Sequence, residues 1–355
     1  MIAPTTATSQ AVLQQAATRP GLAQRNGTRL AWVLAGFVVL LVTVMASLAI
    51  GSKTIPLATV LDALFVPGDS ADQIIVQTLR LPRTLLGLLV GSALGVSGAL
   101  IQALTRNPLA DPGILGVNAG AAFGVVLAVG FLSVTSILGY VWFALLGAAI
   151  ATIVVYAIGA TGRGGATPVR LTLTGVAIGA VLSGITAAIT LLNPAIFDRL
   201  RQWNAGSLVT PGFDTIWAVL PLIAIGLVLA LLVARGLNAV ALGGDLAAAL
   251  GANLVLTRVV VVVAATLLAG AATAAAGPIG FVGLMVPHVA RAIAGPDQRW
   301  IMLLTLVLSP ILLLAADIVG RLVMPPGELQ VGIVTAFIGA PVLIALARRR
   351  RVSGL

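Results

Sequence analysis

The sequence predicts an all-α polytopic membrane protein with ten transmembrane helices, and three observations favour this fold class. Hydrophobic residues make up 59% of the 355 positions and charged residues 8%, far from the roughly 25% of soluble domains. Apolar runs of about 20 residues, enough to cross a bilayer, recur along the chain. Arginines gather between these runs, as the positive-inside rule describes.

The apolar runs give the expected spans in order. Their ranges are 30–50, 81–104, 114–131, 137–160, 171–192, 216–234, 256–276, a short eighth span within 277–291, 300–324 and 331–347. Residues 1–29 are too poor in large apolar groups to fold alone and predict a disordered cytoplasmic tail. Two helices that end in Gly/Pro breaks indicate two inverted five-helix halves, about 30–195 and 196–351, in one transmembrane domain, 30–351.

The stretch from Arg80 to Gly120 organises the expected fold. Pro82 suits the first turn of a helix, where its missing N–H costs nothing. Gly87, Gly91 and Gly95 recur every fourth position and predict a face that another helix can approach closely. A polar break then ends the helix, and it predicts either a connecting turn or backbone that lines protein or water. This break holds Asn107, Pro108, Asp111 and Pro112.

The segments between the spans are expected to lie at the two membrane surfaces. Residues 51–79 predict an external loop, and residues 193–215 return to the external side. Residues 237–253 are too short and interrupted to span, so they predict short amphipathic helices on the cytoplasmic interface. The fifth span carries a second small-residue stripe that predicts close helix packing, with Gly175, Gly179, Ser183 and Ala187 at four-residue spacing.

Charge placement fixes the expected topology. Fourteen of the 20 basic residues fall on the cytoplasmic side of a ten-span arrangement and six outside, with both termini cytoplasmic. Asp317 and Arg321 lie within the ninth span, four residues apart with the acid first, which is the favourable order for a helical ion pair. Because charge is costly at mid-membrane, we expect this pair near the outer interface.

Several function classes are excluded by composition. The absence of cysteine excludes disulfides and thiolate sites, and His288 is the single histidine, so a multi-histidine metal site is excluded too. A structural hydrogen bond is favoured for His288 over ligation or proton transfer. Lys53 is the single lysine and follows no glycine-rich loop, so the chain carries no Walker A motif. Nucleic acid is not an expected partner, because the basic residues are scattered between apolar spans.

Four motifs resemble the permease family of type II ABC importers, which take up iron-siderophores, haem and cobalamin in bacteria. They are LPR with GxxxG and QALxRNPLADPxxLG in 81–116, GPIGFVGLMVPHVAR in 277–291, ADIVGRL in 316–322, and GELQVGIVTAFIGAPVLIALARR in 327–349. The resemblance spans roughly residues 30 to 350. It implies three kinds of protein partner beside the membrane lipid: ATPase subunits, a second permease, which is the same chain or a paralogue, and an extracytoplasmic substrate-binding protein.

The resemblance also implies roles for particular residues. Arginines matching Arg80, Arg83 and Arg321 receive acidic residues of the binding protein in this family, although ion pairing with Asp317 and snorkelling are a simpler explanation. The segment after the sixth span is implied to couple to the ATPase, through Leu242, Gly243, Asp245, Ala248, Leu250 and Gly251. A cytoplasmic turn or gate is implied at Asn107, Pro108, Asp111, Pro112 and Thr167.

We therefore expect a transport subunit of the cytoplasmic (inner) membrane that is not an enzyme. It would bind no cofactor itself, and ATP would be used by the partner ATPase. Ferric siderophores are the expected substrates, with haem or cobalamin as alternatives. An ion-coupled secondary transporter is a second class, because such proteins also contain inverted repeats. A membrane enzyme is a third class, but clustered His, Cys or paired acids are missing.

Overall fold

The computed structural model describes residues 26–66, 68–134, 136–161, 167–209, 212–249, 251, 253–325 and 327–348. Residues 1–25 of the predicted tail, residues 162–166 between α7 and α8, Leu250 and arginines 349–351 lie outside the described residues.

The described chain is all-helical in its regular structure, which confirms the predicted fold class. Its helices are α2 Asn26–Ala49, α3 Leu57–Phe65, α4 Ala71–Ile75, a π-helical turn Val76–Arg80, α5 Leu81–Thr105, a 3₁₀ turn Pro112–Leu115, α6 Val117–Phe131, α7 Ile137–Gly159, α8 Pro168–Leu192, α9 Pro194–Asn204, α10 Asp214–Ala241, α11 Gly244–Ala249, α12 Leu254–Ala276, α13 Val282–Ala294, α14 Gln298–Val323 and α15 Val331–Arg348. Seven of the described helices are long and apolar enough to cross a membrane, and α6, α13 and α15 are shorter apolar helices, so together they match the ten expected spans.

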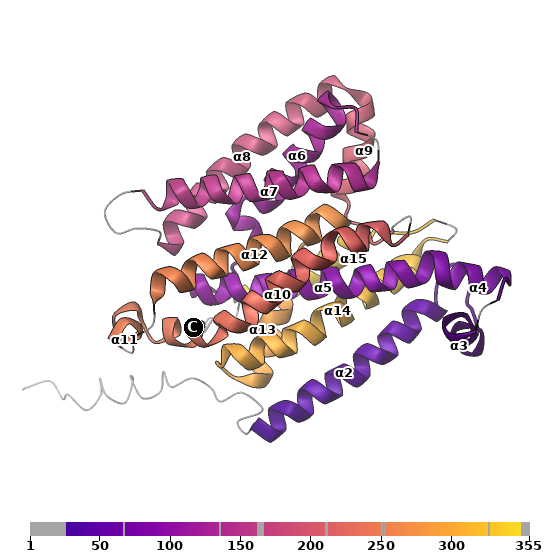
Figure 1. The fold of residues 1–355 in the computed structure, drawn as a ribbon, viewed down its shortest axis with the longest axis horizontal. Helices are drawn as coiled ribbons and strands as arrows, with labels where there is room; N and C mark the ends of the chain where they lie inside the picture. The colour runs from indigo at the N-terminus through magenta and orange to yellow at the C-terminus, as the bar shows by residue number, and fades with distance from the viewer. Residues whose placement is uncertain are drawn as a thin grey trace, which may run out of the picture.

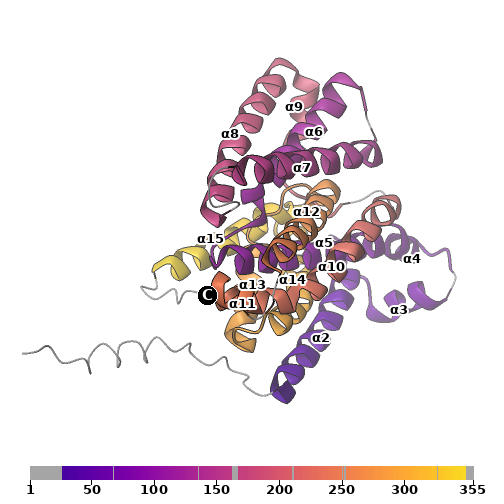
Figure 2. The ribbon, with the colours of Figure 1, turned by 60° about the vertical axis from the view of Figure 1, so that its left-hand side comes forward.

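Helix α5 runs through the centre of the molecule, and α6 to α9 form a group to one side of it in both views (Figures 1 and 2). Helices α3 and α4 lie at one end of the bundle and α11 at the other (Figure 1). We name these the outer end and the inner end, following the predicted topology. The two ends carry the candidate sites described below.

The glycine face of α5 packs against α14, as the spacing predicts. A Cβ on Gly91 would lie 2.7 Å from the Cα of Pro310, and a Cβ on Gly95 would meet the Ser309 side chain. One turn further on, Gly98 faces the backbone of Gly283 in α13. Since lipid supplies no hydrophobic drive for helices to associate, this close backbone approach is what holds the helices together.

Residues 51–79 are not the loop that the sequence predicts, because most of this segment is helical, while its external position stays a prediction. Ser70 and Gln73 form a capping box that starts a helix, with the Gln73 amide donating to Ser70 Oγ at 3.3 Å. The helix continues through the π-helical turn into α5, giving an apolar span from Ala71 to Thr105. A π-helical turn absorbs a change of register without breaking the helix, so the organising helix begins ten residues before Leu81.

Two further boundaries differ from the expected ones. Helix α10 passes Ala234 and ends at Ala241, because Arg235 points to the surface while Leu237 and Val240 stay buried. The helical face therefore continues beyond the arginine that was expected to end the span. Residues 193–215 contain α9, whose start is capped by the Asn193 side chain.

The small-residue stripe of α8 packs over only part of its length. Gly175 lies against the carbonyl of Ile114, but Ser183 and Ala187 are exposed. A Cβ at neighbouring Gly184 would meet nothing within 4 Å. The predicted packing stripe is therefore confirmed within this chain at Gly175, and close packing at Ser183 and Ala187 stays a prediction.

Substitution Gly91→Ala should destabilise the protein, because the added methyl group meets Pro310 backbone that cannot rotate away. Overpacking of this kind costs about 1–3 kcal/mol. Gly184→Ala is the matched control, since it adds the same methyl group in open space within a helix. Thermal unfolding of the purified protein in detergent should show a lower Tm for Gly91→Ala only. Equal Tm values for the two variants would contradict the close contact.

Candidate functional site

A buried ion cluster joins α5 and α14 at the outer end. Arg83 donates to both carboxylate oxygens of Asp317, with Nη2 2.7 Å from Oδ1 and Nε 3.0 Å from Oδ2. Arg321 also donates to Asp317, with Nε 2.9 Å from Oδ2, so the predicted helical ion pair is confirmed. The Asp317 side chain is 1% exposed and the Arg321 side chain 3% exposed. Paired forks of this type fix orientation as well as charge.

Glu328, in the turn before α15, pairs with the remaining guanidinium nitrogen of Arg83. Arg83 Nη1 lies 2.6 Å from Glu328 Oε2. Glu328 is 34% exposed, whereas Arg83 is 12% exposed. The cluster therefore has one member that borders solvent.

Two arginines, Arg321 and Arg80, cap the end of α2. The last carbonyls of a helix have no partner within the helix, and an arginine side chain can satisfy them. Arg321 donates to the carbonyl of Ser47 at 2.8 Å and to that of Ile50 at 3.0 Å. Arg80 donates to the carbonyls of Leu48, Ala49 and Lys53.

All three predicted docking arginines thus gather at the outer end, and each has partners within the chain. Arg80 and Arg321 are buried, and their donors reach backbone carbonyls. Arg83 is the one that contacts a partly exposed carboxylate. Docking of an external protein on these arginines stays a prediction, and it would require exchange of these contacts.

At the inner end, the polar break after α5 forms a compact turn. Arg106 adopts a left-handed conformation with φ 51° and ends the helix. Asn107 Oδ1 accepts from the Leu109 amide at 3.0 Å, and Asp111 Oδ1 accepts from the Gly113 amide at 2.8 Å. Pro108 and Pro112 are buried, while Asn107 is exposed. Burial raises the pKa of Asp111, and the Gly113 hydrogen bond opposes this effect.

Thr167 lies at the inner start of α8 and acts as its N-cap. Its hydroxyl accepts from the Arg170 amide at 3.4 Å. The structure therefore gives Thr167 a local capping contact, and a gating role for it stays a prediction.

Two of the motifs that carry the family resemblance meet at the centre of the inner half. The Gln102 amide donates to the carbonyls of Gly283 and Leu284 at 3.2 and 3.1 Å. Arg291 Nη2 lies 3.4 Å from Gln102 Oε1. His288, in the same helix α13, is half-buried.

The predicted coupling segment follows α10 and contains the six-residue helix α11. Leu242 and Leu246 are 59% and 51% exposed, whereas Ala247 is fully buried. Ala248 is exposed, and the predicted glycines 243 and 251 both have positive φ, 114° and 79°. The Asp245 side chain lies outside the described part of the chain. The segment therefore presents leucines to the outside at the inner end, and Leu246 adds to the predicted set. Its apolar face could be anticipated from the alternation of Leu and Ala.

A polar clamp connects the last turns of α10 to the first turn of α14. Asn238 Nδ2 donates to Asp297 Oδ1 at 2.8 Å, and Asn238 Oδ1 accepts from the Gln298 amide at 2.8 Å. Asp297 also caps α14 by accepting from the Arg299 amide at 3.1 Å. Partial burial works to raise the pKa of Asp297, but hydrogen bonds from Arg299 and Asn238 outweigh it and lower the pKa. Sequence reasoning missed this clamp, because no spacing rule connects positions 238 and 297.

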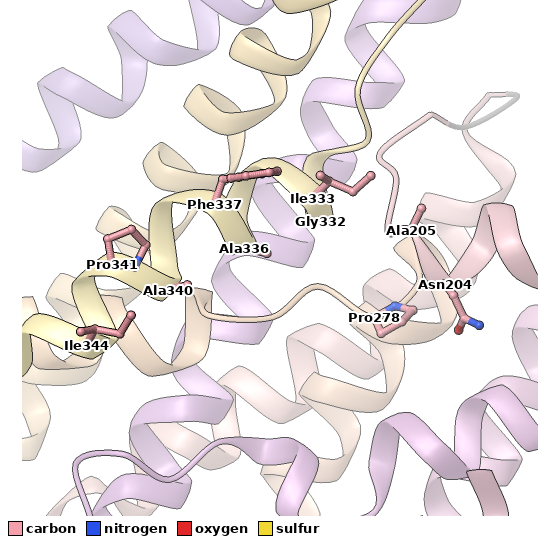
Figure 3. A pocket seen from close by; sticks show the side chains of 10 residues that line it. All are labelled: Asn204, Ala205, Pro278, Gly332, Ile333, Ala336, Phe337, Ala340, Pro341 and Ile344. Carbon is pink, nitrogen blue, oxygen red and sulfur yellow. The ribbon is translucent and has the colours of Figure 1, made fainter. Parts of the chain in front are cut away.

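An apolar groove of about 560 Å³ runs beside α15 (Figure 3). Helix α15 forms one wall, and Asn204, Ala205 and Pro278 face it from the other side (Figure 3). Phe337 and Ile344 in α15 are 75% and 59% exposed. The groove matches the size of ligand pockets, which are usually about 300–1,000 Å³. Over the described residues, no group of three His, Cys, Asp or Glu side chains could hold a metal ion.

These features define a multi-pass membrane protein of the transporter permease class, with an apolar groove and an exposed inner segment. The FecCD transport family model matches residues 39–349. The chain belongs to this family. It is a transport subunit and not an enzyme.

Relatives and a solved structure agree with this assignment. The ferric enterobactin transport system permease protein FepD of Escherichia coli (strain K12) is 50% identical over 320 residues, covering 90% of this chain and 96% of that protein. The cobalamin import system permease protein BtuC of Halobacterium salinarum is 39% identical over 283 residues, covering 80% and 76%. A metal-chelate type ABC transporter solved in an inward-facing conformation aligns with a TM-score of 0.78 and 26% identity, covering 90% of this chain and 99% of that one.

Substitution Asp317→Asn should strongly destabilise the protein, because it leaves buried Arg321 without its ion-pair partner and Arg83 with Glu328 alone. Removing one partner of a buried ion pair costs about 3–5 kcal/mol. Asp198→Asn is the matched control, since its pair with Arg201 is 67% exposed on both sides and should contribute only a few tenths of a kcal/mol. Unfolding in detergent should separate the two variants, and a similar small effect in both would show that the cluster is not a stabilising centre.

Proposed function

We propose that this chain is the membrane permease subunit of an ATP-driven importer of ferric siderophores. The observation that carries the proposal is the 50% identity to a ferric enterobactin permease across 90% of the chain. The iron chelate is the substrate, and haem or cobalamin are the alternatives, since a cobalamin permease is 39% identical. The protein would span the inner membrane with both termini cytoplasmic, as the arginine distribution favours.

The groove beside α15 suits half of a translocation pathway. It is open on the side where Phe337 and Ile344 are exposed, and Ser183 and Ala187 in the outer half of α8 are exposed as well. A second permease copy or paralogue would cover these faces and complete the pathway. Substrate would then pass by alternating access at the interface between the two permeases.

An ion-coupled mechanism is less well supported. Transporters driven by ions carry buried acids that bind the coupling ion or proton. Among the described residues, Asp317 is the acid buried inside a span, and both Arg83 and Arg321 pair with it. A proton or sodium ion would have to compete with two guanidinium groups for this carboxylate.

ATP-dependent uptake by the reconstituted complex tests the proposal, and the inner segment supplies the variant. Leu246→Glu should weaken ATPase binding, because it places charge on an apolar face of α11 that the ATPase would cover. Leu132→Glu is the control, since it changes an exposed leucine at the outer end of α6. ATPase retention on the immobilised permease and siderophore uptake into proteoliposomes should both fall for Leu246→Glu alone. Unaltered assembly and uptake in that variant would argue against coupling through α11.

The proposed outer partner is a substrate-binding protein that presents carboxylates to Arg80, Arg83 and Arg321. We expect the partner to contact Arg83 first, because the guanidinium group of Arg83 already binds Glu328, a carboxylate that borders solvent. A carboxylate of the partner would first replace Glu328 on Arg83. Arg80 and Arg321 would keep their contacts with the carbonyls of α2 until partner carboxylates replace those contacts too.

If a partner carboxylate replaces Glu328 on Arg83, substitutions of Glu328 and of Arg83 should change the affinity for the binding protein in opposite directions. Glu328→Gln should raise the affinity for the binding protein several-fold, because the internal competitor loses its charge. Arg83→Glu should lower the affinity and make it fall less steeply with salt, because an attractive charge pair is removed. Arg201→Glu serves as the control, because this arginine is 67% exposed at the same end. Surface plasmon resonance at low and high salt would measure all three. A control that weakens binding as much as Arg83→Glu would indicate general charge attraction instead.

A further inference from the structure

The coupling segment is joined to the rest of the protein through polar contacts in the last turns of α10. Asn238 lies four residues before Leu242, the first residue of the proposed ATPase-coupling segment, which is about one helical turn. Arg106, at the end of α5, donates to the carbonyl of Val240. The end of α10 is therefore attached to α5 by one residue and to α14 by another.

The contact with α14 is directional on both sides. The amide group of asparagine offers a donor and an acceptor at once. Asn238 uses the donor on Asp297 and the acceptor on the Gln298 amide, which is the first amide of α14 and has no partner within its helix. Both hydrogen bonds are 2.8 Å long. A displacement of Asn238 therefore either carries the start of α14 along or breaks two good hydrogen bonds.

Asp297 extends the connection beyond the two helices. Its carboxylate lies 3.9 Å from Arg29 near the start of α2, and both side chains are largely buried, at 17% and 15% exposure. It also holds the side chain and amide of Arg299. The first turn of α14 is thus fixed in orientation by side chains from α10 and from its own start.

Helices α14 and α5 then reach the outer end as one body. The contact of Gly91 with Pro310 and the ion pair of Arg83 with Asp317 join them at the middle and at the outer end. A movement applied at the first turn of α14 therefore reaches the cluster that is proposed to dock the binding protein.

We infer that Asn238 is a positioning residue for transport, and that its clamp with Asp297 and the Gln298 amide transmits displacement of the ATPase-coupling segment to α14. This inference rests on the proposed function. The clamp does not touch substrate or ATP. It sets how much of the movement at α11 becomes movement of the α5–α14 pair.

The test uses the complete complex of permease, ATPase and binding protein in proteoliposomes. N238D removes the donor and places a second carboxylate beside Asp297, so the clamp opens. We expect siderophore uptake per ATP hydrolysed to fall about tenfold, within the ~5–150-fold range of typical coupling between sites. ATPase retention on the permease should stay at the native level, because Asn238 lies outside the segment that contacts the ATPase.

The double variant N238D/D297N separates a clamp from a merely structural role. In this variant the new side-chain amide at position 297 can donate to the new carboxylate at position 238. That carboxylate can still accept from the Gln298 amide, and the pair again carries a single negative charge. Coupling should therefore recover in the double variant. N253D is the matched control, because it makes the same change at the inner start of α12, where aspartate can keep the cap that Asn253 forms with the Leu256 amide.

Each outcome bears on the inference. Native coupling in N238D overturns it, and so does uncoupling that N238D/D297N fails to rescue. If N238D does not assemble, N238A removes both hydrogen bonds without added charge, and native uptake per ATP in that variant also overturns the inference. A native complex without ATP-dependent uptake would instead refute the proposed function, which keeps the two failures distinguishable.

Discussion

The close approach of α5 and α14 is the constraint on which the rest of the structure depends. Inside lipid, helices gain little by hiding apolar side chains, so backbone contact must supply the attraction. Gly91 allows this contact at the point where Pro310 presents its backbone. Because the helices are fixed at mid-span, their ends lie at defined separations. That placement brings Arg83 to Asp317 at one end and leaves the start of α14 beside α10 at the other.

The ion pairs of the described residues lie at the two ends of the bundle, as expected from the cost of charge at mid-membrane. A buried carboxylate in a low-dielectric interior is tolerated when charged donors surround it, and Asp317 has two arginines. One of the two, Arg321, also donates to carbonyls at the end of α2, so the cluster is both ion pair and helix cap. An outer partner that binds here by carboxylates can therefore sense the position of α2, α5 and α14 together.

The sequence predicts the spans well and the contacts between them poorly. Glycines at every fourth position predict the packing face of α5. The i, i+4 spacing predicts the ion pair between Arg321 and Asp317. Arg83 joins the same carboxylate across 234 positions, and no local rule reaches so far. The start of the organising helix was missed because Gln77, Thr78 and Arg80 interrupt the apolar pattern, although Arg80 is buried on carbonyls. Asn238 looked like one more polar residue in an interfacial segment.

The location of the polar contacts indicates where the protein can switch. At mid-span, α5 and α14 are joined by contacts of small residues, and lipid offers these surfaces no equally close packing partner. We therefore expect α5 and α14 to move as one body. Hydrogen bonds at the interfaces can be exchanged for water or for groups of another protein at small net cost, because the groups that open remain solvated. Glu328 borders solvent at one end, and Asp297 lies beside the partly exposed Arg299 at the other. Rearrangement of the bundle therefore begins at its ends, where the proposed partners bind, and is carried through its middle without breaking it.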